Sequence, residues 1–178
     1  MIVSDLMQAH MRAEELLPRL LRSPDGWQSL DINYHPPRVE RLWRPFGEYR
    51  FFLHVIHPCF DEQALFHPHP WPSTMRIYEG TYRLLVGATS NDEPPPVVFS
   101  STVTVAVGTV YRYEMAHPDG WHAVIPVETP VWTTMLTGQP WRRTIPRVTQ
   151  SVSGSLQPLS QLRIDSMLKK FARLVAAG

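Results

Sequence analysis

The sequence predicts an all-β fold with one helix packed outside at each end of the chain. Three observations lead to this prediction. Residues 29–141 contain many short β-rich segments separated by turn signals, and no helical pattern alternates with them. The chain has 18 prolines in 178 residues, about twice the usual share of ~5%, which suits short strands, edges and turns. Apolar residues recur at helical spacing only near the two ends.

The two terminal segments are predicted to be amphipathic helices. Residues 4–22 carry leucines and alanines at helical spacing, and Pro18 predicts a kink or a division into two shorter helices. Residues 158–176 repeat the pattern, and Lys169, Lys170 and Arg173 suit the negative end of a helix dipole. We expect each helix to pack on the central body or against a second subunit.

The central segments are predicted to be strands of a sandwich or closed barrel in a single domain, residues 1–178. Pro45, Phe46 and Gly47 interrupt the pattern, and Glu79 with Gly80 predicts a tight hairpin turn. The expected strands are residues 30–34, 39–43, 49–56, 74–78, 81–86, 97–107, 110–115, 121–127 and 131–136.

The bulk composition excludes several classes of function. With 43% hydrophobic and 19% charged residues, the chain has the composition of a globular protein. Its net charge of +1 offers no basic field for a phosphate backbone, so we expect no nucleic-acid partner. No apolar run approaches the ~18 residues of a membrane span. Cys59 is the only cysteine, so no intrachain disulfide can form, which fits a cytoplasmic location.

His67 and His69 are the first candidates for metal ligands. On an extended segment, residues i and i+2 point to the same side, with Cα atoms ~6.6 Å apart. Both rings can then converge on one ion. The neighbouring prolines Pro68 and Pro70 stiffen the backbone on which the pair is presented. A surface polar pair in a loop would give the same pattern, so spacing alone leaves both interpretations open.

His122 is the candidate for a third ligand. The turn residues Pro118, Asp119 and Gly120 deliver it to the start of the apolar segment 121–126. A histidine at the head of a buried strand is also a common core residue, so His122 is informative only together with the first pair.

Taken together, the two histidine segments resemble the two motifs of the cupin superfamily. His67 and His69 match the HxH of its first motif, and Gly80 follows at the family's distance. Pro118, Gly120 and His122 stand where its second motif belongs. The resemblance covers roughly residues 49–141, about half of the chain. It implies a double-stranded β-helix barrel (a jelly roll) that holds a divalent metal in its mouth through His67, His69 and His122.

The chain also departs from the family pattern. Counting from His69, the family's glutamate ligand would fall at Ser73, which leaves a three-histidine site. Glu79 falls in the hairpin, so we expect it to be exposed and away from the metal. His117 competes with His122 for the role of third ligand. We prefer His122, because a strand follows the ligand histidine directly in the family.

Three neutral imidazoles leave an ion its full charge and open positions, which favours anionic or chelating substrates. The resemblance implies a mononuclear metal enzyme, and we expect an iron(II) dioxygenase acting on a small organic substrate. Zinc, nickel or manganese would also suit the ligands. A zinc- or manganese-dependent isomerase or lyase is one alternative, with His54 or Tyr78 as general base. A non-catalytic cupin that binds a small ligand or has a structural role is the other.

Other residues are candidates for substrate contacts. Arg76 and Tyr78 lie on the strand after the histidine pair, and Arg76 could anchor a carboxylate or simply be an exposed strand arginine. His54 is expected to line the pocket and support the ligands. His10 and His35 are interpreted as surface or packing residues. We expect a homodimer with a small molecule as its other partner.

Overall fold

The computed structural model describes residues 3–69, 71–89, 97–113, 121–139 and 156–177. Within these residues, ten strands and two α-helices follow one another along the chain. The elements are α1 Val3–Leu20, β1 Gln28–Ile32, β2 Val39–Phe46, β3 Tyr49–Ile56, the short 3-10 helix Asp61–Gln63, β4 His67–Pro68, β5 Ser73–Glu79, β6 Thr81–Thr89, β7 Val97–Ala106, β8 Val110–Tyr113, β9 Trp121–Pro126, β10 Val131–Thr137 and α2 Gln161–Ala177.

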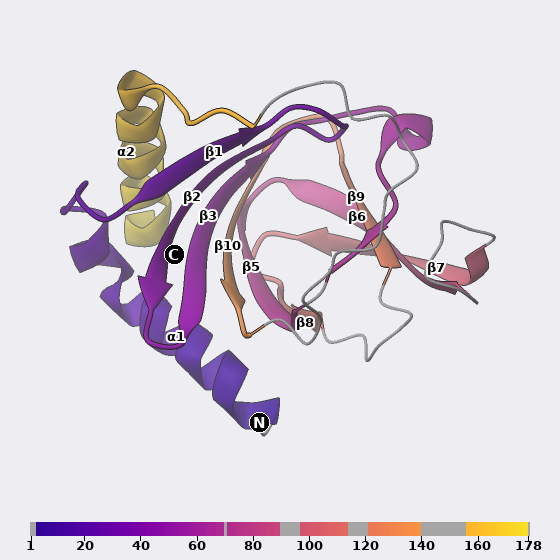
Figure 1. Cartoon of the computed structure of the whole chain (residues 1–178), viewed down its shortest axis with the longest axis horizontal. Coiled ribbons are helices and arrows are strands. Elements are labelled where there is room, and N and C mark those ends of the chain that lie inside the picture. Colours follow the sequence, from indigo (N-terminus) through magenta and orange to yellow (C-terminus); the bar gives the residue numbers. More distant parts are fainter. Residues whose placement is uncertain (1–2, 70, 90–96, 114–120, 140–155, 178) are drawn as a thin grey trace.

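The strand order is that of a jelly roll. One sheet has the order β1-β2-β3-β10-β5-β8 and the other has the order β4-β9-β6-β7. All of their pairings are antiparallel, and eight strands pair in a nested series: β3 with β10, β4 with β9, β5 with β8, and β6 with β7. A long hairpin rolled up on itself gives this arrangement, in which two sheets face each other (Figure 1). The predicted double-stranded β-helix is therefore confirmed.

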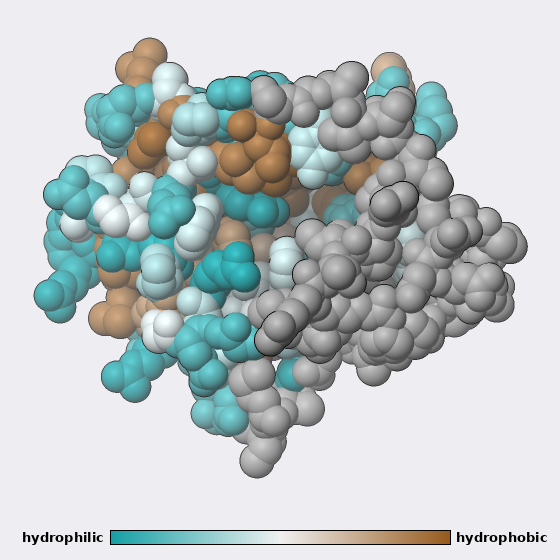
Figure 2. All heavy atoms as spheres, viewed as in Figure 1, coloured by the Kyte–Doolittle hydropathy of each residue, from teal (hydrophilic) through white to brown (hydrophobic). Residues whose placement is uncertain are grey.

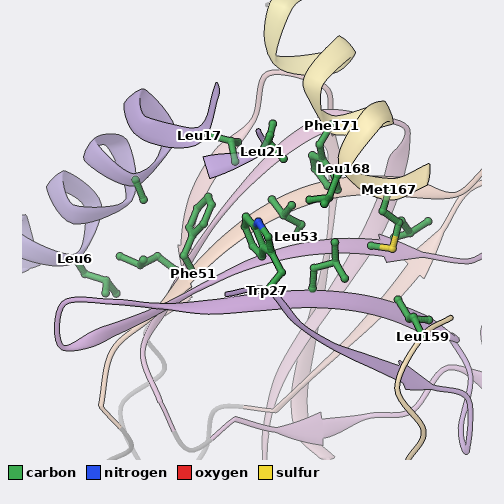
Figure 3. Close-up of a cluster of buried hydrophobic side chains, with 14 residues drawn as sticks. Leu6, Leu17, Leu21, Trp27, Phe51, Leu53, Leu159, Met167, Leu168 and Phe171 are labelled. Atoms are coloured by element: carbon green, nitrogen blue, oxygen red, sulfur yellow. The ribbon is translucent and has the colours of Figure 1, made fainter. Parts of the chain in front are cut away.

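Both helices cover the outer face of the six-stranded sheet, on the side away from the four-stranded sheet (Figure 1). Leu17 of α1 and Phe171 of α2 are fully buried there against outward-facing side chains such as Phe51 and Leu53 of β3. Figure 3 shows the two helices directing these side chains toward the same sheet. This cluster holds the terminal elements on the barrel, as the sequence predicted.

The inner face of the same sheet packs against the second sheet. Alternate residues point inward along each strand, so Phe52 of β3, Met75 of β5 and Met135 of β10 lie in one cluster with Tyr82 of β6 and Val124 of β9. The central strands of the large sheet, such as β3, therefore have two buried faces, one toward the helices and one toward the interior of the barrel.

Two features differ from the sequence prediction. The first helix is continuous, with Pro18 inside its last turn, and Leu17 and Leu21 hold this end against the sheet. The second strand continues through Pro45 to Phe46. It can do so because β1 pairs with β2 only as far as Trp43, so the missing N–H of Pro45 falls where β2 has no partner on that side.

Among the described residues, no helix is long and apolar enough to cross a membrane.

A buried carboxylate ties α2 to the sheet. Glu40 on the outer face of β2 is only 3% exposed. It accepts hydrogen bonds from Arg163 of α2 at 2.7 Å and from His57 at 2.8 Å, and Arg38 adds an ion pair. Burial alone would raise the pKa of Glu40, but the hydrogen bonds from His57 and Arg163 outweigh it and lower the pKa to about 2.

The aromatic anchor of α2 gives the first prediction. Phe171→Ala should lower the free energy of unfolding by about 3–5 kcal/mol, because the ring is fully buried and packs against Trp132 and Tyr78. Leu162→Ala, on the same helix at 83% exposure, should change it by less than about 0.5 kcal/mol. Urea denaturation measures both values. Equal effects of the two substitutions would contradict the docking of α2.

The Glu40 cluster predicts an acid-sensitive fold. The pKa of Glu40 is lower in the folded chain than in the unfolded chain, so its contribution is complete above pH ~4.5 and is lost as the pH falls toward 2. The loss should approach about 3 kcal/mol. Glu40→Gln should be less stable at pH 6 and should lose less stability on going to pH 3.

The matched control for this measurement is Glu62→Gln, which removes an exposed carboxylate. Denaturant unfolding at pH 6 and pH 3 should give the control the same pH dependence as the unaltered chain. The same pH dependence in Glu40→Gln would contradict the account of the Glu40 cluster.

Candidate metal centre

Three histidine side chains converge inside the barrel. His67 and His122 come from the four-stranded sheet, and His69 directly follows β4. His67, His69 and His122 each offer a ring nitrogen, and these atoms lie within 4.8 Å of one another. Their ring centroids are 4.6 to 4.9 Å apart. The predicted convergence of the three rings is confirmed. His117, the competing candidate, lies outside the described residues.

Strand pairing places these rings. His67 of β4 stands directly opposite His122 of β9, and Pro68 stands opposite Trp121. On its other side His122 pairs with Val86 of β6, which fixes β9 in the middle of the sheet. His69 lies two residues after His67 and returns to the same face. Although β4 is only two residues long and was not predicted as a strand, its pairing with β9 aligns two of the three rings.

Hydrogen bonding and burial leave the histidines ready to act as ligands. Nδ1 of His67 donates to the carbonyl oxygen of Leu65 at 2.9 Å, so its Nε2 carries the lone pair. Burial lowers the pKa of His67 to about 4. Burial, with repulsion from the neighbouring histidines, lowers the pKa of His69 and of His122 well below the usual value. All three imidazoles are therefore neutral at pH 7.

This donor set fits one divalent transition metal. Neutral imidazole binds zinc, iron, copper and nickel, whereas calcium and magnesium prefer oxygen ligands. Ligand nitrogens around one such ion lie roughly 3 Å apart, so the most widely separated ring nitrogens would have to come up to about 2 Å closer together. Among the described residues the cluster contains no carboxylate. An ion held there would keep its full charge.

The histidines line a cavity of about 420 Å³ between the two sheets. Figure 2 shows a recess in this face of the molecule with hydrophobic side chains beside it. Apart from the histidines, most of the lining is apolar, and it includes Leu30, Ile32, Val39, Ile56, Met75 and Met135. A pocket of this size and character suits a small organic molecule.

The six-stranded sheet supplies two polar groups to the pocket. His54 of β3 lines the pocket, where the sequence placed it, and Arg41 of β2 stands opposite it in register. Nε of Arg41 donates to Nε2 of His54 at 2.9 Å. Sequence reasoning missed Arg41. One signal was present, because Arg41 alternates with Val39 and Trp43 on one face of its strand.

The structure places Arg76 and Tyr78 away from the histidines, on the outer face of β5. Nε of Arg76 donates to Glu14 of α1 at 2.7 Å, and the Tyr78 hydroxyl donates to the same carboxylate at 3.3 Å. Thr134 completes this contact from β10. The two side chains expected near the substrate instead fasten α1 to the sheet.

Glu79 is partly exposed at the end of β5 and pairs with Lys170 of α2, so its expected absence from the histidine cluster is confirmed. Gly80 beside it has a φ of +86°, which a side chain would strain. Ser73 is buried at the start of β5 but is not among the described residues that line the pocket.

The structure corrects the interpretation of His35 as a surface or packing residue. His35 lines the pocket, and its ring centroid is 6.0 Å from that of His67. No local sequence pattern indicates this position of His35, because the segment after β1 reaches the pocket only through the tertiary fold. His10 of α1 is buried and hydrogen-bonds to Thr134 of the sheet, which agrees with a packing role.

Comparison with known proteins gives distant structural similarity. No protein-family model and no curated protein matches the sequence. Hydroxypropylphosphonic acid epoxidase from S. wedmorenis aligns with a TM-score of 0.47 and 11% identity, over 65% of this chain and 56% of that chain. AerE from Microcystis aeruginosa aligns with a TM-score of 0.45 and 18% identity, over 75% and 52%. An RmlC-like cupin from Shewanella frigidimarina gives 0.43 and 11%, over 69% and 86%.

The chain thus spans little more than half the length of the first two of these structures. Its own strand order, with nested pairing of β3 to β10, is that of the jelly roll. Its three converging histidines occupy the interior of that roll. The chain therefore has the cupin-type double-stranded β-helix fold, with a three-histidine cluster inside it.

Proposed function

We propose that this protein is a mononuclear metal-dependent enzyme, an iron(II) dioxygenase that acts on a small organic substrate. One observation carries the proposal: three neutral imidazoles converge on the wall of an apolar cavity of about 420 Å³. An iron(II) ion held by the three histidines would supply open coordination positions for a substrate and dioxygen. The apolar lining supports this chemistry, since it limits the access of water to the reacting groups.

The choice of a redox reaction over an acid–base reaction is supported by the positions of the two candidate bases. Tyr78 lies on the far face of the sheet, where burial and the Glu14 carboxylate raise its pKa. His54 lies in the pocket, but its Nε2 already accepts the hydrogen bond from Arg41. Neither group is placed to take a proton from a bound substrate, so an isomerase or lyase that relies on them is disfavoured.

The resemblance to the cupin superfamily supports iron, because some of its members hold iron with three histidines and react with dioxygen. A non-catalytic cupin that binds a small ligand is the second candidate. The observation in its favour is that the described residues place no carboxylate beside the histidines. The two candidates differ in one measurable property, which is oxygen consumption by the iron-loaded protein.

The ligand set predicts a selective loss of metal. His67→Ala and His122→Ala should each lower the iron or zinc content from about one ion per chain to a small fraction, because two imidazoles bind an ion much more weakly than three. His35→Ala removes a histidine of the same pocket that lies outside the cluster, and it should keep the metal. Ser73→Ala should keep it as well.

Elemental analysis after equilibrium dialysis against one metal at a time measures these contents, and circular dichroism establishes that each variant is folded. Metal loss from His35→Ala as complete as that from His67→Ala would contradict the three-histidine assignment. Stoichiometric metal in His67→Ala would do so as well.

The reaction is tested by oxygen uptake. Protein loaded with iron(II) under anaerobic conditions should consume dioxygen when diketones or thiols are supplied, and zinc-loaded protein should not, because zinc(II) has no accessible redox change. His67→Ala is the control for uptake by unbound iron. Stoichiometric iron without uptake on either panel would favour the non-catalytic cupin.

A further inference from the structure

Arg41 differs from several other arginines of the chain in having no acidic partner among the residues that the structure describes. Arg38, Arg76, Arg83 and Arg163 each form an ion pair with an aspartate or glutamate. Within the residues that the structure describes, Arg41 has a hydrogen bond to His54 and lies over the ring of Phe52, 5.2 Å from its centroid. No described carboxylate lies within ion-pair distance of it.

The position of this guanidinium makes the missing partner significant. Arg41 lines the same cavity as the three histidines. Burial lowers its pKa to about 10, so it still carries a positive charge at pH 7. Arg41 is half-buried. A charge partly withdrawn from water without a counter-ion is unfavourable, and an anion that enters the cavity reduces this cost.

The hydrogen bond to His54 sets the direction of the guanidinium. Nε of Arg41 is engaged with Nε2 of His54, and no described acceptor takes the protons of its two terminal nitrogens. A guanidinium presents its donors in a planar fork that matches a carboxylate in a bidentate contact. Arg41 therefore retains donors for an anion, while His54 positions it.

The rest of the pocket defines what the anion is attached to. Arg41 is the only arginine or lysine among the described lining residues. In the metal-free pocket one guanidinium balances one negative charge, which suits a monocarboxylate better than a doubly charged phosphate. The aliphatic and thioether side chains of the lining suit an apolar body behind that carboxylate.

We propose that Arg41 is the anion-binding residue of this pocket and that the substrate is a small carboxylic acid with an apolar body. This inference rests on the proposed function for its catalytic meaning, because it names the substrate class of the same cavity. The binding of the anion, in contrast, depends only on Arg41 and the residues that line the cavity.

Binding to the metal-free protein tests the proposal without any turnover. The probes are hexanoate, its uncharged analogue hexanamide, and inorganic phosphate, titrated by calorimetry into chelator-treated protein. Hexanoate should bind more tightly than hexanamide or phosphate. Arg41→Met should weaken hexanoate binding roughly 10- to 100-fold, the usual value of a charge-assisted contact. Arg41→Lys should fall between, because it keeps the charge without the fork.

Arg83→Met is the matched control, since it removes a strand arginine whose ion pair with Asp61 lies outside the pocket. It should bind hexanoate as the unaltered chain does. Equal affinity of the unaltered chain for hexanoate and hexanamide would overturn the proposal without requiring any variant to fold. So would tighter binding of phosphate, or unchanged hexanoate binding by a folded Arg41→Met protein.

The same titration separates this inference from the metal proposal. If the chain takes up no metal but hexanoate binding depends on Arg41, the metal proposal fails and the anion site stands. If metal binds normally and hexanoate binding does not depend on Arg41, the anion site fails and the metal proposal stands.

Discussion

The pairing of β3 with β10 joins segments that lie some 80 residues apart, from Ile56 opposite Val131 to Arg50 opposite Thr137. Each of the two strands has one face toward the helices and one toward the barrel interior. Phe51 and Leu53 therefore support α1 and α2, while their neighbours Phe52 and His54 point into the barrel interior. The helix-packed core and the pocket are two sides of the same ladder, so one long-range contact establishes both. Closing a loop of that length costs entropy, which burial on both faces offsets.

Much of the fold was predictable because its signals are local. Alternation of apolar residues located β3 and β10, and helical spacing located α1 and α2, since each pattern depends on residues close in sequence. The two-residue strand β4 gave no such signal, because it is a strand only by virtue of its pairing with β9. Helix continuity at Pro18 was also undetermined, since packing against the sheet decides it.

The candidate site was predictable in part for a related reason. The histidine spacing and the family resemblance identified His67, His69 and His122. For the arginines, alternation shows which residues share a face but not which face is inside. Arg76 was therefore placed near the substrate, although its face of β5 carries α1. Arg41 was overlooked, although its face of β2 lines the pocket. Only the assembled sheets distinguish these two positions.

Glu40 and Arg41 are neighbours on β2 and point to opposite sides of the sheet. One places a carboxylate under α2, and the other places a guanidinium in the pocket. A shift of this strand by one residue would exchange them. The carboxylate would then meet the histidines, and the guanidinium would meet Arg163 beneath the helix. Such a misaligned chain would suffer like-charge repulsion outside and would offer an acidic rather than a basic pocket inside. The two adjacent charges thus favour one register of the β1–β2–β3 meander, and the same register determines whether the cavity is basic or acidic.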